Sequence, residues 1–388
     1  MKSNTNKTAE NTRLMPGEKK AESRIKLTGD LNGKNNVVLT RPYILEYMGR
    51  ESSSVTAEIL TELMTLNENV THPLETPVTW ESDIRDESVK YRVELSLNEN
   101  FNDVIVFNGK DDYPSQSVGG ENSIYISNLM IGKKYFYRVV GKCENGDEYF
   151  SETGKFVTDG TPARWVNWGG AFNSRDLGGW KTTDGKFVRQ GLIYRGTRLQ
   201  ETDGTAVADE KIQDYIIGTF GLKTDIDLRG LWNDPLSVTK SLNGKMQLIS
   251  APITAYADVF VNPDTKKGLK TVFSIFADAS KYPLYIHCHG GADRTGTTAF
   301  LLNGLLGVPY EDLIRDYELT SFSVGFVGLR YRKDYAIGFF NALNEYGEKK
   351  GVKGLSETIE LWLTDYVGVT AEEIAAIKYL LLENDDKK

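Results

Sequence analysis

The sequence contains very little cysteine and histidine. Among 388 residues there are two cysteines, Cys143 and Cys288, and three histidines, His72, His287 and His289. Two cysteines so far apart exclude a disulfide framework, and neither residue type has the spacing of a structural zinc site. We therefore expect no metal and no cofactor. Two of the three histidines flank one cysteine, which indicates that specialised chemistry is concentrated there.

Long apolar runs are also missing. No segment approaches the roughly 18 residues that a membrane-spanning helix needs. The net charge of -8 disfavours general attraction to nucleic acid or to anionic membranes. The first residues are polar and lack the apolar core of a signal peptide, so we predict a leader without fixed structure at residues 1–36. The whole chain has the length of two domains.

Residues 37–160 carry the alternation of apolar and polar residues that is typical of β-strands. Turn-forming residues separate short runs at 91–97, 104–107, 124–126, 135–140 and 155–158, which predicts an antiparallel all-β sandwich. From Pro77 onward, the positions of Trp80, the Leu129–Val139 run and Phe156 resemble a fibronectin type III domain of the immunoglobulin-like class. Such a domain serves as a spacer or adhesion module, and a domain that only buttresses its neighbour fits equally well.

Residues 284–296 place a strand, a loop and a helix N-terminus in that order. The first N–H groups of a helix favour negative charge. Gly290 and Gly291 allow the loop amides to turn inward as an anion-binding nest. The pattern therefore predicts an anion-binding site at the end of the strand.

Cys288 and Arg294 lie at the two ends of this loop, with five residues between them. A guanidinium can bind two phosphate oxygens in one plane. A thiol beside a helix N-terminus and a cation ionises easily. The usual interpretation of a lone cysteine is a small buried apolar residue, but the residues around Cys288 favour chemistry.

Two stretches resemble the bacterial atypical protein tyrosine phosphatases, a family that includes lipid and triple-specificity phosphatases. One is the loop His287–Gly296, and the other is Asn173-Ser174-Arg175-Asp176-Leu177-Gly178-Gly179 with the later Tyr194-Arg195-Gly196-Thr197. The resemblance extends from about residue 165 to residue 383. Within residues 161–388, strands alternate with helices, which predicts an α/β cysteine-phosphatase domain with a mostly parallel sheet between helices. Its active loop is expected at the carboxyl end of a strand.

Three strands and seven helices are predicted in this second domain. They are strands at 222–229, 246–250 and 284–287, and helices at 206–218, 266–280, 297–306, 309–320, 331–346, 356–366 and 371–382. Thr370 and Glu373 predict a capping box on the last helix.

The resemblance implies a metal-independent phosphomonoesterase that acts through a phosphocysteine on Cys288. Arg294 and the loop amides would stabilise the charge on the equatorial oxygens. His287 is expected to order the loop from behind, and Thr295 to donate a hydrogen bond to the sulfur. The other residues expected to form the phosphate-binding loop are His289, Gly290, Gly291 and Ala292.

Supporting roles are open for the residues of the second stretch. Arg175 and Asp176 are expected either to brace the loop from the neighbouring strand or to form an ion pair within their own stretch. The same two interpretations apply to Arg195 and Thr197.

A general acid must protonate the leaving oxygen and later activate water. Asp293 lies inside the loop, where the family commonly carries an aspartate. Asp258 lies thirty residues before Cys288, where many tyrosine phosphatases place a mobile acid. Asp234, in Trp232-Asn233-Asp234-Pro235, is only superficially similar to their Trp-Pro-Asp. Asp293 ranks first, Asp258 second and Asp234 third, and for the last two ordinary turn chemistry is the alternative.

Family members often have lysine where this chain has Ala292. Its absence beside Asp293 favours a singly phosphorylated partner, such as a phosphotyrosine-containing protein, over phosphoinositides. His289 could restore some positive charge at low pH. The alternatives are a lipid phosphatase of the same family and a pseudophosphatase that only binds phosphate.

Two further alternatives concern other classes of protein. A rhodanese-type sulfurtransferase also has an anion-binding cysteine loop, but it needs no arginine at the sixth position after the cysteine. An adhesin with an attached enzyme would make the β domain the main functional part. Reduced thiol chemistry suits the cytosol, whereas bacterial fibronectin-like modules occur mostly on exported enzymes, so the expected location is export or the cell surface.

Overall fold

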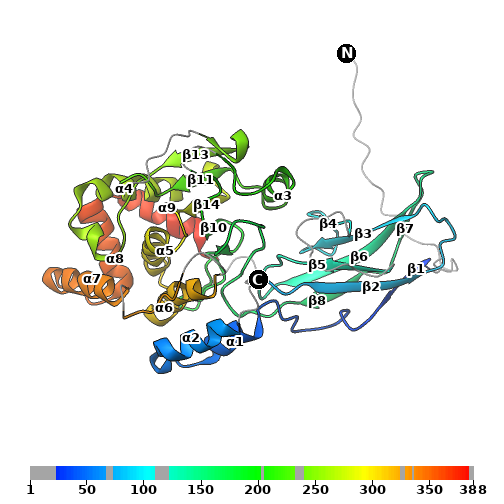
Figure 1. The fold of residues 1–388 in the computed structure, drawn as a ribbon, viewed down its shortest axis with the longest axis horizontal. Helices are drawn as coiled ribbons and strands as arrows, with labels where there is room; N and C mark the ends of the chain where they lie inside the picture. The colour runs from blue at the N-terminus through cyan, green and yellow to red at the C-terminus, as the bar shows by residue number, and fades with distance from the viewer. Residues whose placement is uncertain are drawn as a thin grey trace, which may run out of the picture.

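The computed structural model describes residues 23–66, 73–109, 122–201, 205–231, 240–323, 328–333 and 336–383. These residues form two bodies that lie side by side (Figure 1). Strands β1–β8 form the first, here called the β body, and all later strands belong to the second, the α/β body. No described helix is long and apolar enough to pass through a lipid bilayer.

The β body consists of two antiparallel sheets. One has the order β1-β2-β5 and the other β4-β3-β6-β7, with β8 also paired to β6. The inward side chains of both sheets, including Trp80, Val93 and Tyr137, share one hydrophobic core. The strands are Ile25–Thr28, Thr76–Ser82, Lys90–Ser96, Ile105–Phe107, Ser123–Ile126, Lys134–Lys142, Glu148–Phe150 and Gly154–Val157. The resemblance to fibronectin type III domains stays a prediction.

The N-terminal part of the chain differs from its prediction. Ile25–Thr28, placed in the expected leader, forms strand β1 and pairs with β2; residues 1–22 lie outside the described residues. Within the predicted sandwich, Pro42–Gly49 and Ala57–Thr65 form helices α1 and α2. Their apolar side chains pack in the core of the α/β body, because Tyr43, Ile44 and Tyr47 lie on one helical face.

The sheet of the α/β body has the order β12-β13-β11-β14-β10-β9. Its four central strands are parallel, and β12 and β9 are antiparallel at the edges. The strands are Arg175–Asp176 (β9), Ile193–Gly196 (β10), Thr224–Asp227 (β11), Lys240–Ser241 (β12), Met246–Ser250 (β13) and Leu284–His287 (β14). The predicted strands at 246–250 and 284–287 are confirmed.

Side chains of β14 alternate between two cores, as the pleat of a strand requires. Leu284 and Ile286 face the core that is shared with three helices, α4 (Pro263–Phe276), α5 (Asp293–Leu305) and α6 (Tyr310–Leu319). Tyr285 faces the opposite core, which contains Trp168 and residues of helix α3 (Glu210–Phe220). The sheet is thus covered on both faces, which explains why every residue of β11 and β14 is buried.

The helices agree with the predicted ones in type and differ mainly at their ends. They are α3 (Glu210–Phe220), α4 (Pro263–Phe276), α5 (Asp293–Leu305), α6 (Tyr310–Leu319), α7 (Ala336–Lys350), α8 (Leu355–Trp362) and α9 (Ala371–Leu381). The capping box on α9 is confirmed. The predicted helix at 331–346 starts later, because residues 331–333 are non-helical and contact α6 and the segment between α1 and α2.

Candidate active site

The residue after β14 is Cys288, and helix α5 begins at Asp293. The loop between them and the first two residues of α5, residues 288–294, are together called the signature loop below. It lies at the carboxyl ends of three neighbouring parallel strands, because Asp227, His287 and Gly196 are in register. A central strand in a parallel sheet delivers the loop to the position where such sheets bind ligands.

The first half of the signature loop has its carbonyl groups engaged from outside. The carbonyl oxygen of Cys288 lies 2.8 Å from Nδ1 of His287. The carbonyl oxygen of His289 accepts a hydrogen bond of 3.2 Å from the backbone N–H of Arg198. His287 is the last residue of β14, and Arg198 follows the end of β10 by two residues. The sheet itself therefore holds this half of the loop.

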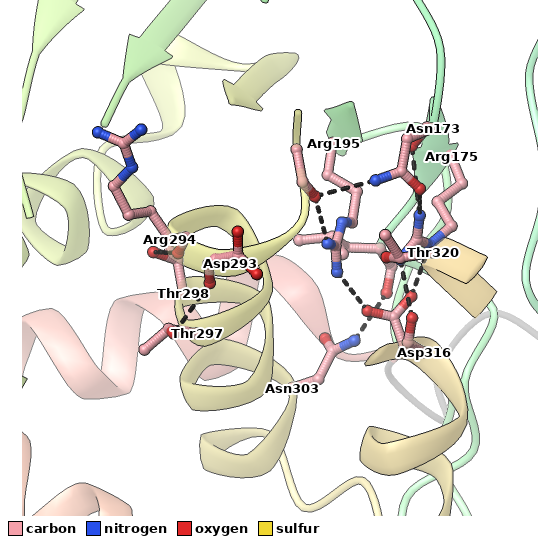
Figure 2. Close-up of polar contacts among 12 residues, drawn as sticks. Asn173, Arg175, Arg195, Asp293, Arg294, Thr297, Thr298, Asn303, Asp316 and Thr320 are labelled. Carbon is pink, nitrogen blue, oxygen red and sulfur yellow. Dashed lines mark hydrogen bonds and ion pairs between the residues drawn. The ribbon is translucent and has the colours of Figure 1, made fainter. Parts of the chain in front are cut away.

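The second half is held by two side chains (Figure 2). Nδ2 of Asn173 donates to the carbonyl oxygens of Gly290 and Gly291 at 3.2 and 3.1 Å. Nη2 of Arg195 donates to the same Gly291 oxygen at 2.6 Å. In a planar trans peptide, the N–H points away from the C=O. The N–H groups of residues 289–292 therefore point away from these donors, which forms an anion-binding nest at the start of α5.

The thiol of Cys288 is suited to nucleophilic chemistry. Burial opposes its ionisation, but the positive charge of Arg294 and the hydroxyl and N–H of Thr295 outweigh burial and lower the pKa of Cys288. The negative charge of Asp293 acts in the opposite direction. These are the partners that the sequence places around the thiol, and a lowered pKa is the condition for a thiolate nucleophile.

His287 lies behind the loop and is fully buried. Its Nε2 lies 3.1 Å from Oδ1 of Asp225 and 3.7 Å from Oδ2 of Asp227. Burial alone would lower the pKa of His287, but the two carboxylates outweigh burial and raise it to about 9. At neutral pH the ring is an imidazolium, so its Nδ1–H donates to the carbonyl oxygen of Cys288.

A buried ion-pair network supports Asn173 and Arg195 (Figure 2). Asp316 of α6 accepts from Nε of Arg175 at 2.8 Å and from Nη1 of Arg195 at 2.6 Å. Nη1 of Arg175 donates to Oδ1 of Asn173 at 2.5 Å, which orients the amide group of Asn173 toward the loop. Burial would raise the pKa of Asp316, yet the two guanidinium groups hold it below its usual value.

Arg175 thus supports the loop indirectly, because its side chain bonds to Asn173, Asp316 and Thr320. Asp176 has a different place from the predicted one. Its carboxylate accepts from Nη1 of Arg164 at 2.9 Å and from the N–H groups of Gly178 and Gly191. Strand β9 separates the two residues because neighbouring side chains of a strand point to opposite faces. The carbonyl of Thr197 accepts from Tyr285.

Asp293 lies at the other end of the signature loop, in the first turn of α5. Its carboxylate accepts from the hydroxyl of Tyr256 and from Nε of Arg330 at 3.0 Å. Its side chain is 41% exposed. Its place in the loop and its partial exposure fit a group that exchanges protons with a bound ligand.

The other two candidate acids have different outcomes. Asp258 is an exposed residue of the short 3-10 helix Tyr256–Phe260, where its backbone N–H and C=O join turn hydrogen bonds. Asp234 lies outside the described residues.

His289 adds less positive charge than the sequence indicated. Burial, Arg198 and Arg229 lower its pKa below the ordinary histidine value, so protonation requires a more acidic solution. In the part of the chain that the structure describes, no group of three or more His, Cys, Asp and Glu side chains is placed to hold a metal ion.

Sequence reasoning missed several residues that contact the loop or its supports. Asn173 begins the stretch 173–179 that resembles the family, but the sequence indicated no role for its side chain. Asp225, Asp316 and Arg330 are distant in sequence from the residues they contact, and only the fold brings them together. For Asp316 a usable signal was its place inside the predicted helix 309–320, three residues after Leu313, since a carboxylate on an apolar helical face needs a partner.

Comparison with known proteins identifies the family of this region of the chain. The profile of the tyrosine phosphatase family matches residues 166–383, more than half of the chain. A protein of Cupriavidus necator named as a tyrosine-protein phosphatase is 28% identical over 167 residues. That match covers 37% of this chain and 59% of the length of the relative.

Two solved structures are also similar. The core catalytic domain of the PP-IP phosphatase SIW14 from S. cerevisiae has 16% identity and a TM-score of 0.26, covering 42% of this chain and 92% of that one. A second Siw14 catalytic core has 15% identity and a TM-score of 0.28, covering 45% and 82%. The family profile spans the β9 stretch, the signature loop and the helices after it, and the chain therefore belongs to the tyrosine phosphatase family.

Proposed function

We propose that the protein is a metal-independent phosphomonoesterase that forms a phosphocysteine on Cys288. The observation that carries this proposal is the set of outward-held carbonyls in residues 288–291, which leaves successive N–H groups to bind phosphate oxygens. Arg294 and the N-terminus of α5 add positive charge at the same place. Such preorganised donors stabilise the charge that develops on a transferring phosphoryl group.

The reaction has two steps. The Cys288 thiolate attacks phosphorus, an S–P bond forms, the ester P–O bond breaks, and a protonated acid gives its proton to the leaving oxygen. A water molecule then attacks phosphorus and gives a proton to the same acid, now a carboxylate. The S–P bond breaks, the thiolate returns and inorganic phosphate leaves. The Thr295 groups that favour the thiolate also favour its departure.

Asp293 is the acid we assign to both steps. It directly precedes Arg294, and its carboxylate is partly exposed at the end of the loop. Asp258 is instead an exposed residue whose backbone N–H and C=O make turn hydrogen bonds with neighbouring residues.

The proposed substrate is a singly phosphorylated group, with a phosphotyrosine-containing protein as the partner. Ala292 contributes no charge to the loop, and Asp293 contributes a negative one. His289 adds little, because its pKa is lowered. The name of the Cupriavidus necator relative fits the same substrate class. A phosphoinositide is the alternative substrate, and a binding-only pseudophosphatase is the alternative function.

Hydrolysis of p-nitrophenyl phosphate in the presence of EDTA tests the proposal. We expect wild-type turnover to survive chelation and the Cys288→Ser variant to lose at least ~10³-fold in kcat, because a hydroxyl replaces the thiolate nucleophile. Asp293→Asn should lower kcat by about 10²-fold and remove the alkaline limb of the pH profile, whereas the matched Asp258→Asn should retain both.

Each result has a defined opposite. No wild-type turnover together with retained vanadate binding would establish the pseudophosphatase. Turnover that disappears with EDTA would contradict the metal-independent mechanism. Faster hydrolysis of phosphoinositide vesicles than of phosphotyrosine peptides would replace the proposed substrate.

A further inference from the structure

The segment 328–333 contributes one side chain to the signature loop. Arg330 lies 37 residues after Asp293, and its Nε and Nη2 lie 3.0 and 3.4 Å from the two carboxylate oxygens of Asp293. The side chains of Arg330 and Asp293 are 22% and 41% exposed, so water screens this ion pair only in part. The negative charge of Asp293 raises the pKa of Cys288. A cation on Asp293 therefore acts on the reactive centre.

The position of Arg330 is set by its neighbours in the chain. The hydroxyl of Ser321 bonds to both the N–H and the carbonyl of Arg330, at 2.7 and 3.1 Å. Two residues later, Arg332 pairs through Nε and Nη2 with the fully buried Glu318, at 2.8 and 2.7 Å. These contacts attach both sides of Arg330 to α6 and the turn after it.

The N-terminal helices complete this attachment. The hydroxyl of Tyr47 on α1 donates to Oε2 of Glu318 at 2.8 Å. Nη1 of Arg332 donates to the hydroxyl of Ser52, between α1 and α2, at 2.7 Å. Residues between strands β1 and β2 of the β body therefore hold the segment that carries Arg330, although they lie outside the matched family region.

Two tyrosines from other elements also lie near Asp293. Tyr256 donates its hydroxyl to Asp293, and Tyr317 of α6 packs edge-on against Tyr256 with ring centroids 6.1 Å apart. Burial and Asp293 raise the pKa of Tyr256, so its hydroxyl stays neutral. Within the loop, Arg294 is the cation next in sequence. Arg330 is thus the cation that the rest of the fold brings to this carboxylate.

We propose that Arg330 is a positioning residue for Asp293, holding its carboxylate through Nε and Nη2 at the start of α5 in the free enzyme. The segment that carries Arg330 is kept in place by Glu318 and the N-terminal helices. Arg330 supplies, from outside the loop, a positive charge that Ala292 does not provide. This role rests on the proposed function where turnover is measured, because Asp293 is the acid assigned there.

The first test needs no turnover. The rate of Cys288 alkylation by iodoacetamide is measured against pH, and its midpoint reports thiolate formation. We expect Arg330→Gln to raise the midpoint by roughly 0.5–1 pH unit, less than a direct charge contact would give. In the Asp293→Asn background, the rise of the midpoint should be less than half of that value. Arg330→Lys should raise the midpoint less than Arg330→Gln does.

The second test uses turnover of p-nitrophenyl phosphate. Arg330→Gln should change the alkaline limb of the pH profile of kcat/KM, because the proposed acid loses the guanidinium group that contacts its carboxylate. It should lower kcat by about 10-fold in the wild-type background and less than about 2-fold with Asp293→Asn, the non-additivity expected of residues that act together.

Arg315→Gln is the matched control. Arg315 is 21% exposed, pairs with Asp312 and donates to the backbone of Arg50 at the end of α1, but it belongs to α6 rather than to segment 328–333. It should leave both pH profiles unchanged. Equal shifts with and without Asp293, or equal shifts in Arg315→Gln, would overturn the proposal. An inactive wild type would remove the proposed function and leave the alkylation result to decide the role of Arg330.

Discussion

At the scale of single residues, the signature loop depends on positions that have no room for a side chain. Gly291 has φ +65°, and a Cβ there would lie 2.1 Å from the carbonyl oxygen of Gly196. Gly196 is equally restricted, since its Cβ would lie 2.3 Å from the hydroxyl of Tyr285. The close approach of the loop to β10 is what allows Asn173 and Arg195 to reach its carbonyls.

We predict that Gly291→Ala displaces the loop and lowers kcat/KM for p-nitrophenyl phosphate by at least ~10²-fold. The added methyl would overlap backbone atoms of β10 that cannot move without breaking the sheet. Gly221→Ala is the control, because Gly221 also has φ +65° but has no atom within 4 Å of its Cβ position. It should cost only the backbone strain, about 1–3 kcal/mol of stability. Equal kinetic losses in both variants would show that strain alone is responsible.

At the scale of elements, strands β11 and β14 place a charged cluster beneath the loop. Asp225 and Asp227 lie on the same face of β11, two residues apart, and His287 lies opposite Asp227 in the parallel register. The raised pKa of His287, about 9 against 6.5 for an ordinary histidine, means that folding favours the imidazolium. Its contribution to stability is present below pH 6.5 and is lost as pH rises through 9.

We therefore predict that the protein loses up to about 3 kcal/mol of unfolding free energy between pH 6.5 and pH 9.5 through His287. The lowered pKa of Cys288 acts in the opposite direction, so denaturant unfolding is compared in the Cys288→Ser background. His287→Asn in that background should remove most of the pH dependence. A slope that persists in His287→Asn would assign it to other groups.

Helices α1 and α2 illustrate how an element can serve a distant part of the chain. They lie between strands β1 and β2 of the β body in sequence but pack their apolar faces on the α/β body, with Tyr43 and Tyr47 against Phe322. The buried Glu318 receives hydrogen bonds from α1 and from Arg332. A buried carboxylate without such partners would be strongly unfavourable, so these contacts fix the position of the helices.

At the scale of the whole molecule, the two bodies are joined by hydrogen bonds to one loop of the β body, residues 128–131. Arg164 donates to the carbonyls of Asn128 and Leu129 at 2.8 and 3.0 Å, and it also pairs with Asp176. The amide group of Gln190 bonds to both the N–H and the carbonyl of Ile131. Asp176 thus contributes to the attachment of the β body.

We predict that Gln190→Ala weakens this attachment. The backbone groups of Ile131 would lose two partners, at a cost of about 1–3 kcal/mol. Limited proteolysis should cleave the seam at residues 159–163 faster than in the wild type. Gln247→Ala, which removes one exposed contact with Lys281 inside the α/β body, should not change cleavage there. Faster cleavage in both variants, or in neither, would contradict a specific role for Gln190.

The sequence alone determined the features that depend on neighbouring residues. The strand, the loop and the helix around Cys288, the Cys288–Arg294 spacing, and the capping box at Thr370 are local patterns, and the structure has each of them. Local patterns also predicted most strands and helices of the α/β body, since apolar periodicity reports the buried face directly. The roles assigned to the site residues stay predictions.

Only the tertiary structure decided which distant residues meet. Helices α1 and α2 were missed because their packing face belongs to a body that begins some hundred residues later, and no local pattern shows this. Asp316, Arg330 and Asp225 contact the loop or its supports across dozens of residues. The physical reason is that a buried charge needs a partner of opposite charge or a hydrogen-bonding group. Local sequence does not determine which distant residue is that partner, because the partner is set by how the elements pack.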